Sequence, residues 1–185
     1  MLLSINYSTD LKSIISILLL TTTMHACQEN QAPQGDGLPT QREVNKSMED
    51  INRQMALEED AEIEGYAQRQ GWEMTKTGTG LRYMIYEEGP EGPAALEGQV
   101  ATVHYEVSLT DGTIVYASSE QGARSFLIGQ DNVESGIHEA IQYLKVGDKA
   151  RVILPSHLAH GLTGDNDKIP PRSTVIYDLE LLSLR

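Results

Sequence analysis

A strand–turn–strand pattern near the middle of the chain constrains the fold most strongly. Four apolar residues alternate with polar ones, as in a strand with one buried face: Val103, Tyr105, Val107 and Leu109. Asp111-Gly112 follows, and residues 113–116 have the composition of a second strand. Asp-Gly between two such segments is the strongest short-range signal for a β-hairpin. The chain is therefore expected to build its core on antiparallel strands.

Three further strands and one helix are predicted around this hairpin. The strands cover residues 81–86, at an edge of the sheet, 150–154, which Pro155 ends, and 174–182. Helical spacing of apolar residues predicts a helix that Gly147 closes: Val133, Ile137, Ala140, Ile141 and Leu144. A polar loop spans residues 156–172. The pattern predicts an α+β fold, a curved antiparallel sheet of about five strands wrapped around one short helix.

An acidic helical segment precedes this domain, which we place at residues 72–185. Residues 41–71 hold eight acidic and four basic side chains and no proline, and Gly71 is a plausible carboxyl-terminal cap. An imperfect apolar stripe runs among these charges: Met48, Ile51, Met55, Ile63, Tyr66 and Ala67. The segment is expected to be an N-terminal helical extension with a solvated face. An acidic docking surface and a dimerising helix are the alternatives.

The first forty residues have the pattern of a signal peptide followed by a lipid-attachment site. Lys12 precedes the short apolar run 14–20, which has the length of a signal-peptide core. Ala26-Cys27 then resembles a bacterial lipoprotein box, in which the cysteine receives a lipid and becomes the new amino terminus. We therefore expect a signal peptide at 1–26, lipidation of Cys27 and a flexible tether at 27–40. The alternative is an ordinary secretory signal followed by an incidental cysteine.

Composition excludes several classes of protein. The net charge of −13 over 185 residues argues against nucleic acid as a partner, because phosphate binding needs clustered Lys and Arg. The single cysteine cannot form an internal disulfide. No apolar run reaches the roughly 18–20 residues of a membrane-spanning helix.

A set of ordered motifs in the last third of the chain carries a family resemblance. The motifs follow one another with family spacing: Val103-His104-Tyr105, Asp111-Gly112, Phe126-Leu127-Ile128-Gly129, Gly136, Lys145-Val146-Gly147-Asp148, Gly161, Ile169-Pro170-Pro171 and residues 174–182. Residues 72–185 thereby resemble an FKBP-type peptidyl-prolyl cis-trans isomerase. Three further features resemble one subgroup of this family, the gliding-motility-associated lipoproteins of Bacteroidetes. They are the acidic helix, the segment Thr77–Leu81 and the lipoprotein-like start of the chain.

The resemblance implies a set of pocket residues. Tyr105, Phe126, Val133, Ile169 and Tyr177 match the family pattern. The position whose backbone N–H faces the substrate carbonyl falls on Glu134, the floor position on Ile137, and the loop tyrosine on His160. Val115 and Tyr116 would form the pocket rim, in place of an aromatic and an acidic residue. A further aromatic position falls on Arg124, so the pocket is expected to be more open and less aromatic than is usual.

The resemblance implies an isomerase (a rotamase) that needs no cofactor and no metal. Its partners would be proline-containing segments of unfolded or exported proteins, and it would sit in the bacterial cell envelope, lipid-anchored in the outer membrane and facing the periplasm. The alternative is a non-catalytic FKBP-like chaperone or a binding module of an envelope machine for gliding motility. His157 and His160 near Asp165 and Asp167 lack a third convincing metal ligand. Ser118 and Ser119 lack the Gly-x-Ser-x-Gly context of a hydrolase.

Metabolic labelling with a fatty acid tests the anchor. The wild-type protein should carry the label, and Cys27→Ala should lose it, because the thiol of Cys27 is the predicted acceptor. Retention of the label by Cys27→Ala would show that Cys27 is not the site of lipidation.

Overall fold

The structure, a computed structural model, describes residues 38–185. The predicted signal peptide, Cys27 and most of the predicted tether lie outside the described residues. The compact unit that contains the sheet runs from Ser47 to Arg185. No helix within residues 38–185 combines the length and the apolar character needed to cross a membrane.

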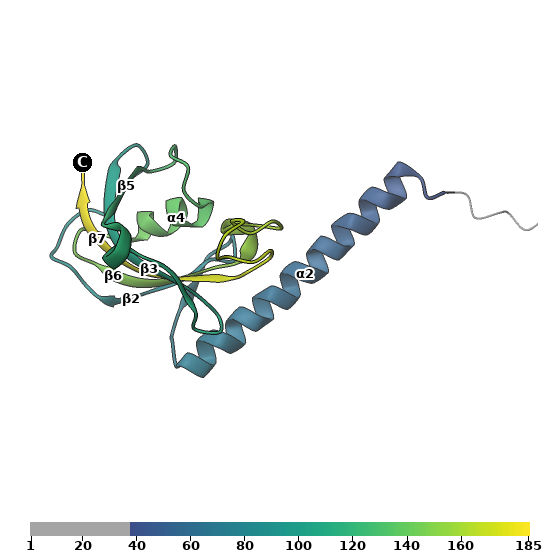
Figure 1. The fold of residues 1–185 in the computed structure, drawn as a ribbon, viewed down its shortest axis with the longest axis horizontal. Coiled ribbons are helices and arrows are strands. Elements are labelled where there is room, and N and C mark those ends of the chain that lie inside the picture. Colours follow the sequence, from purple (N-terminus) through teal and green to yellow (C-terminus); the bar gives the residue numbers. More distant parts are fainter. Residues whose placement is uncertain (1–37) are drawn as a thin grey trace, which may run out of the picture. The chain divides into compact units, whose positions relative to one another are not determined.

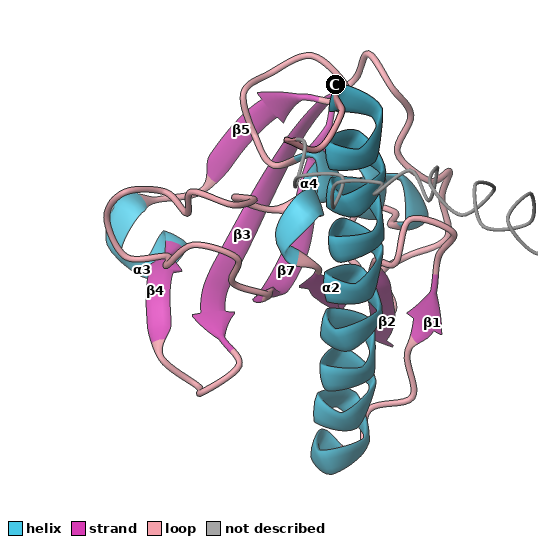
Figure 2. Cartoon of the chain, turned by 90° about the vertical axis from the view of Figure 1, so that its right-hand side faces the viewer, coloured by secondary structure: helices cyan, strands magenta, loops and turns pink. Residues whose placement is uncertain are grey.

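One antiparallel sheet forms the framework of this unit (Figures 1 and 2). Its strands, in chain order, are β1 (Thr75–Lys76), β2 (Arg82–Glu87), β3 (Val100–Leu109), β4 (Ile114–Ala117), β5 (Arg124–Leu127), β6 (Lys149–Leu154) and β7 (Val175–Leu184). They pair in the order β1-β2-β6-β7-β3-β4, and β5 also pairs with β3. The α+β fold expected from the sequence, a curved antiparallel sheet around a short helix, is confirmed.

Within residues 38–185 one helix is long and the others span only a few residues. The helices are α2 (Gln41–Gln70), α3 (Ser118–Gln121), α4 (Ser135–Ala140) and the 3-10 turns η1 (Ile141–Tyr143) and η2 (Ser156–Leu158). Figure 1 shows α4 on the concave side of the curved sheet. Gly136 permits this close approach, because a Cβ at this position would lie 2.5 Å from Leu154 of β6.

Two strands were absent from the sequence-based expectation. The five predicted strands correspond to β2, β3, β4, β6 and β7, whereas β1 and β5 are additional. Both are short: β1 has two exposed residues, and β5 begins with two exposed residues, so neither carries a period-two apolar pattern. Residues 82–87 are consequently not at the edge of the sheet, because β1 pairs outside β2.

The main core lies between the sheet and α4. Val103, Val107 and Leu179 of the sheet and Ile137 and Ala140 of α4 are all buried in it. The register between β3 and β7 runs from the pair Ala101–Leu184 to the pair Leu109–Val175. Because side chains alternate along a strand, this register sends one face of both strands toward α4.

The C-terminal half of α2 packs against the sheet. Ile63 and Ala67 are buried with Ile153 of β6 and Ile176 of β7. Beside them the buried Arg82 guanidinium of β2 lies 2.9 Å from the Asp60 carboxylate. The sequence places the start of the domain at residue 72, whereas in the structure the last turns of α2 share its core. Only these two residues of the helix are buried, in keeping with its broken apolar stripe.

Two isoleucines of α2 provide a matched test of this packing. Ile63 is 1% exposed and Ile51 is 49% exposed. Ile63→Ala should lower the free energy of unfolding by about 2–5 kcal/mol, because it leaves a cavity in the core. Ile51→Ala should change it by less than about 0.5 kcal/mol. Denaturant unfolding measures both, and equal effects would contradict the packing described.

Candidate functional site

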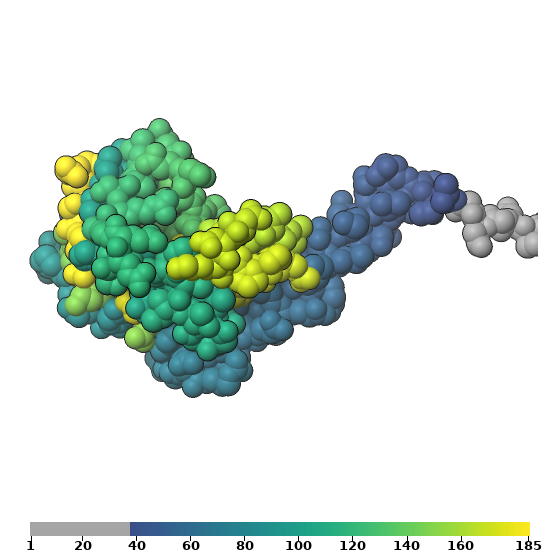
Figure 3. Space-filling model, viewed as in Figure 1, coloured from purple at the N-terminus to yellow at the C-terminus, as the bar shows by residue number. Residues whose placement is uncertain are grey.

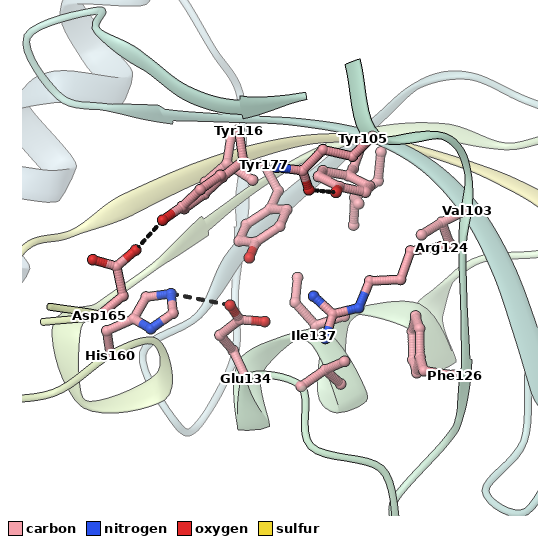
Figure 4. Close-up of a pocket in the computed structure, with 14 residues that line it drawn as sticks. Val103, Tyr105, Tyr116, Arg124, Phe126, Glu134, Ile137, His160, Asp165 and Tyr177 are labelled. Atoms are coloured by element: carbon pink, nitrogen blue, oxygen red, sulfur yellow. Dashed lines mark hydrogen bonds and ion pairs between the residues drawn. The ribbon is translucent and has the colours of Figure 1, made fainter. Parts of the chain in front are cut away.

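A cavity of about 220 Å³ opens between the concave face of the sheet, α4 and the loop between β6 and β7 (Figure 4). Its apolar wall consists of Val103, Tyr105, Val107, Phe126, Val133, Ile137, Tyr177 and Leu179. Its polar lining consists of Tyr116, Gln121, Arg124, Glu134, His160 and Asp165. Apolar walls with a few convergent polar groups are typical of sites that bind organic ligands.

Strand alternation builds the back of the cavity. Val103, Tyr105 and Val107 occupy every second position of β3, so their side chains leave the same face of the sheet. Tyr177 and Leu179 do the same on β7, whose pairing with β3 places Tyr177 opposite Val107. Tyr105 is partly buried and donates a hydrogen bond from its hydroxyl to Gln121 Oε1 at 2.9 Å. The ring of Tyr105 is thereby held at the mouth of the cavity.

The start of α4 contributes the floor and a backbone donor. Glu134 is the residue before the first turn of α4, and Ile137 lies one turn further on, 4% exposed. Among residues 38–185 no acceptor is found for the Glu134 backbone N–H. The N–H groups at the start of a helix have no partner within the helix. A carbonyl oxygen of a ligand could therefore accept a hydrogen bond here.

The loop between β6 and β7 closes the cavity on one side. His160 Nε2 lies 3.0 Å from Glu134 Oε1, so the loop meets the start of α4 directly. The Tyr116 hydroxyl of β4 donates a hydrogen bond to Asp165 on the same loop. Lys168 Nζ donates to the carbonyl of Val115 at 3.0 Å. Figure 3 shows the loop, in yellow-green, against the teal-green segment that holds β4.

Hydrogen bonding fixes the charge state of Asp165. Burial of this carboxyl favours its neutral form, but the Tyr116 hydroxyl and the backbone amides of Asp167 and Ile169 hydrogen bond to the carboxylate and hold its pKa at about 2. In turn, the hydrogen bond to Asp165 raises the pKa of Tyr116 to about 12, and burial acts in the same direction. At neutral pH the pair is a neutral phenol donating to a carboxylate.

Tyr177 and Arg124 bring further polar groups to the cavity. Burial is the main reason that the pKa of Tyr177 lies well above its ordinary value, and the Glu134 carboxylate acts in the same direction. Figure 4 shows the Tyr177 hydroxyl directed toward Glu134 and the Arg124 guanidinium directed into the cavity. Arg124 also donates to the carbonyl of Asn132 at 3.2 Å. The cavity thus has an apolar back and a polar, partly charged front.

Most of the residues expected at the site do lie together. Tyr105, Phe126, Val133, Glu134, Ile137, His160, Tyr177 and Tyr116 all line the cavity. Val115 and Ile169 are not among its lining residues. They are 4% and 2% exposed and are buried in the main core. Because successive side chains on a strand point in different directions, Tyr116 lines the cavity and Val115, directly before it on β4, does not.

Some lining residues were not expected from the sequence. Val103 and Val107 have the same strand parity as Tyr105, so the alternation that predicted the strand was a sufficient signal for them. Leu179 has the same parity as Tyr177. Gln121 and Asp165 come from connections between strands, where no periodicity predicts the direction of a side chain.

The weaker constellations named from the sequence lie in different surroundings. His157 Nε2 pairs with the carbonyl of Thr79 at 3.1 Å, whereas His160 faces Glu134. Within residues 38–185 no three His, Cys, Asp or Glu side chains are grouped as metal ligands. Ser118 Oγ accepts a hydrogen bond from the backbone N–H of Tyr105 and lies 3.2 Å from His104 Nδ1, outside the cavity.

Comparison with known proteins assigns the family. A family model of the FKBP-type peptidyl-prolyl cis-trans isomerases matches residues 92–182. The FKBP-type 22 kDa peptidyl-prolyl cis-trans isomerase of Escherichia coli is 31% identical over 148 residues, which cover 77% of this chain and 69% of that protein. The chain belongs to the FKBP-type peptidyl-prolyl cis-trans isomerase family.

Other members of this FKBP family are also similar to the chain. FK506-binding protein 1A of Neurospora crassa is 32% identical over 107 residues, which cover 57% of this chain and 89% of that protein. FkpA of Buchnera aphidicola subsp. Acyrthosiphon pisum is 35% identical over 109 residues, which cover 59% of this chain and 44% of that protein. The chain spans only 39–44% of the length of FkpA relatives from Neisseria meningitidis and Buchnera.

The Asp165 carboxylate gives a prediction for acid stability. Asp165 stays ionised in the folded protein down to pH of about 2, whereas an unfolded aspartate titrates near about 3.9. Its contribution to stability is therefore complete above pH of about 4 and is lost as the pH falls toward about 2. Asp165→Asn should be less stable than wild type at neutral pH, and the difference should shrink between pH 4 and 2. Denaturant unfolding at a series of pH values measures this.

Asp50→Asn is the control, because Asp50 is exposed on α2. It should follow the wild-type curve throughout. A difference between Asp165→Asn and wild type that stays constant down to pH 2 would contradict the role given to the ionised carboxylate.

Proposed function

We propose that this protein is a peptidyl-prolyl cis-trans isomerase and that the cavity between α4 and the sheet is its active site. The observation that carries the proposal is the apolar wall of Tyr105, Phe126, Val133, Ile137 and Tyr177 beside the Glu134 backbone N–H, for which residues 38–185 offer no acceptor. A proline ring is a compact apolar group of a size that such a wall can enclose. The family assignment supports the same reaction.

The reaction needs differential binding rather than covalent chemistry. Rotation about an X–Pro bond faces a barrier of roughly 18–20 kcal/mol, because the planar amide loses its resonance. The twisted amide is less dipolar than the planar one. Transfer from water to an apolar site therefore destabilises the twisted amide less than the planar amide. A donor such as the Glu134 N–H holds the carbonyl while the proline ring turns. Interactions that are stronger in the twisted geometry than in the planar one lower the barrier.

The polar front of the cavity favours a second candidate function. Glu134 and His160 place a carboxylate and an imidazole, 3.0 Å apart, beside the apolar wall, and Arg124 adds a guanidinium. These groups suit a site that holds an extended peptide by hydrogen bonds to its backbone and polar side chains. A non-catalytic binding module or chaperone, docked in an envelope machine, would use the cavity in this way. The turnover measurement below separates the two functions.

We also propose where the protein acts. The apolar run 14–20 and Ala26-Cys27 support export and a lipid anchor, with the domain attached to the outer membrane and facing the periplasm. In that position its clients would be proline-containing segments of exported proteins that are still folding. The acidic helix and the lipoprotein start support a place among the gliding-motility-associated lipoproteins. Fractionation of cell envelopes, with Cys27→Ala as the matched variant, tests the location.

Tyr177 tests the site itself. Tyr177→Ala removes part of the apolar wall and should lower kcat/KM for a short X–Pro peptide by about tenfold or more, equivalent to about 1.4 kcal/mol of transition-state stabilisation. A protease-coupled assay on protein shown to be folded measures it, with Tyr177→Leu as the gentler change. EDTA should leave the rate unchanged.

Asp178→Asn is the matched control on β7. Asp178 lies on the opposite face of the sheet, where it pairs with Arg151 and accepts a hydrogen bond from Tyr86. This variant should turn over peptide at the wild-type rate. Wild-type turnover by folded Tyr177→Ala would show that this cavity is not the active site. Absence of turnover by the wild type would favour the binding module.

A further inference from the structure

One carboxylate on α2 holds both ends of the loop that closes the cavity. Glu59 Oε1 accepts a hydrogen bond from the backbone N–H of Ser156 at 2.7 Å, and Glu59 Oε2 accepts one from the Ser156 hydroxyl at 2.9 Å. The Thr174 hydroxyl donates to Oε1 at 2.8 Å. Ser156 stands just after β6 and Thr174 just before β7. Glu59 is therefore bonded to the loop where it leaves the sheet and where it returns.

Hydrogen bonds continue from this point to the cavity. The carbonyl of Ser156 accepts from the backbone N–H of Gly161 at 2.7 Å, and the carbonyl of Gly161 accepts from the backbone N–H of Arg172 at 2.8 Å. Gly161 is the neighbour of His160, whose ring lies 3.0 Å from Glu134. The path from α2 to the cavity thus passes through Ser156 and Gly161.

The loop depends on such support because its backbone is unfavourable in places. Arg172 and Asn166 have positive φ angles of 57° and 61°, which side-chain-bearing residues adopt rarely. Such residues cost free energy and persist only where the surroundings hold them. Loss of the bonds to Glu59 would release the two ends between which these residues lie.

The position of Glu59 is itself fixed by the core. Glu59, Ile63 and Ala67 follow one another at intervals of four, so they share one face of α2. Ile63 and Ala67 are buried against β6 and β7, the strands that flank the loop. Asp60, which follows Glu59 in the chain, pairs with the buried Arg82. The core contacts of the helix therefore fix the position of the Glu59 carboxylate beside the loop.

We infer that Glu59 is a positioning residue of the active site, which sets the place of His160 and Asp165 at the cavity by tying the loop to α2. The inference rests on the proposed isomerase function for its kinetic consequence, and on hydrogen bonding alone for its structural one. Bonds to an ionised acceptor are stronger than bonds between neutral groups. Without Glu59 the partly buried Ser156 N–H would lose its acceptor, and a buried N–H without a hydrogen bond costs free energy.

Three variants of the full chain separate positioning from general stability. Glu59→Ala removes all three bonds. Glu59→Gln keeps Oε1 for the Ser156 N–H and Thr174, and its amide can donate to the Ser156 hydroxyl. Glu62→Ala is the matched control, because Glu62 is an exposed acid near Glu59 whose side chain forms no hydrogen bond or ion pair with another described residue.

Hydrogen exchange is the readout that does not depend on activity. In Glu59→Ala the amides of Gly161 and Arg172 should exchange at least about tenfold faster than in wild type, while the amides of the β3–β7 ladder keep their protection. Glu62→Ala should match wild type, and Glu59→Gln should lie between wild type and Glu59→Ala, because its neutral amide replaces an ionised acceptor. Equal protection of the loop in Glu59→Ala and Glu62→Ala would overturn the inference, whether or not the protein is an isomerase.

Kinetics test the effect on the active site. Glu59→Ala should lower kcat/KM by about tenfold, because small displacements of binding groups are costly. Glu59→Gln should restore most of it. In a cycle with His160→Ala, the double variant should lose less than the product of the two single losses, since both changes act on one group.

The two proposals fail differently. Strictly multiplicative losses in the cycle would reduce Glu59 to a stabilising residue and so overturn the inference. Absence of turnover by the wild type would instead count against the isomerase, and the exchange experiment would still decide whether Glu59 ties down the loop.

Discussion

The ladder between β3 and β7 is the interaction on which the cavity depends. Its register pairs Tyr177 with Val107 and Leu179 with Tyr105. Side chains alternate along both strands, so a slip of one residue in either would turn its part of the apolar wall to the opposite face. The same register leaves Asp178 on the far side, paired with Arg151. One set of backbone hydrogen bonds therefore decides which side chains a ligand can meet.

A second level of organisation joins segments that lie far apart in the chain. The cavity takes its apolar back from strands and its polar front from the start of α4, from β5 and from the β6–β7 loop. Glu134 and His160 meet from two of these segments, and Tyr116 and Asp165 join a strand to the loop. None of these contacts is local in sequence, so the polar front exists only once the sheet is complete.

The sequence predicts the framework better than the details of the site. The alternation of Val103 to Leu109 and the Asp-Gly pair predicted β3 and β4, and the helical spacing from Val133 predicted α4. The short strands β1 and β5 carry no period of their own and form because a neighbour offers free backbone groups. Ile63 and Ala67 belonged to the predicted apolar stripe, but two buried residues among thirty make the stripe too weak to predict that the helix joins the core. Asp165 and Glu59 act through loops and tertiary contacts, which no spacing rule describes. Val115 was expected at the pocket rim from its family position alone, whereas the structure buries it in the core.

The place of β7 in the sheet has a consequence for how the protein reaches its native state. β7 is the last strand of the sheet in chain order, yet it lies between β6 and β3. Until it inserts, β1, β2 and β6 form one ribbon and β3, β4 and β5 form another, with no ladder between them. Pairings of this kind close long loops and are slow. The domain must therefore acquire its central strand after all the others have been synthesised, and a nascent chain that ends before residue 175 has two exposed strand edges and an incomplete binding cavity.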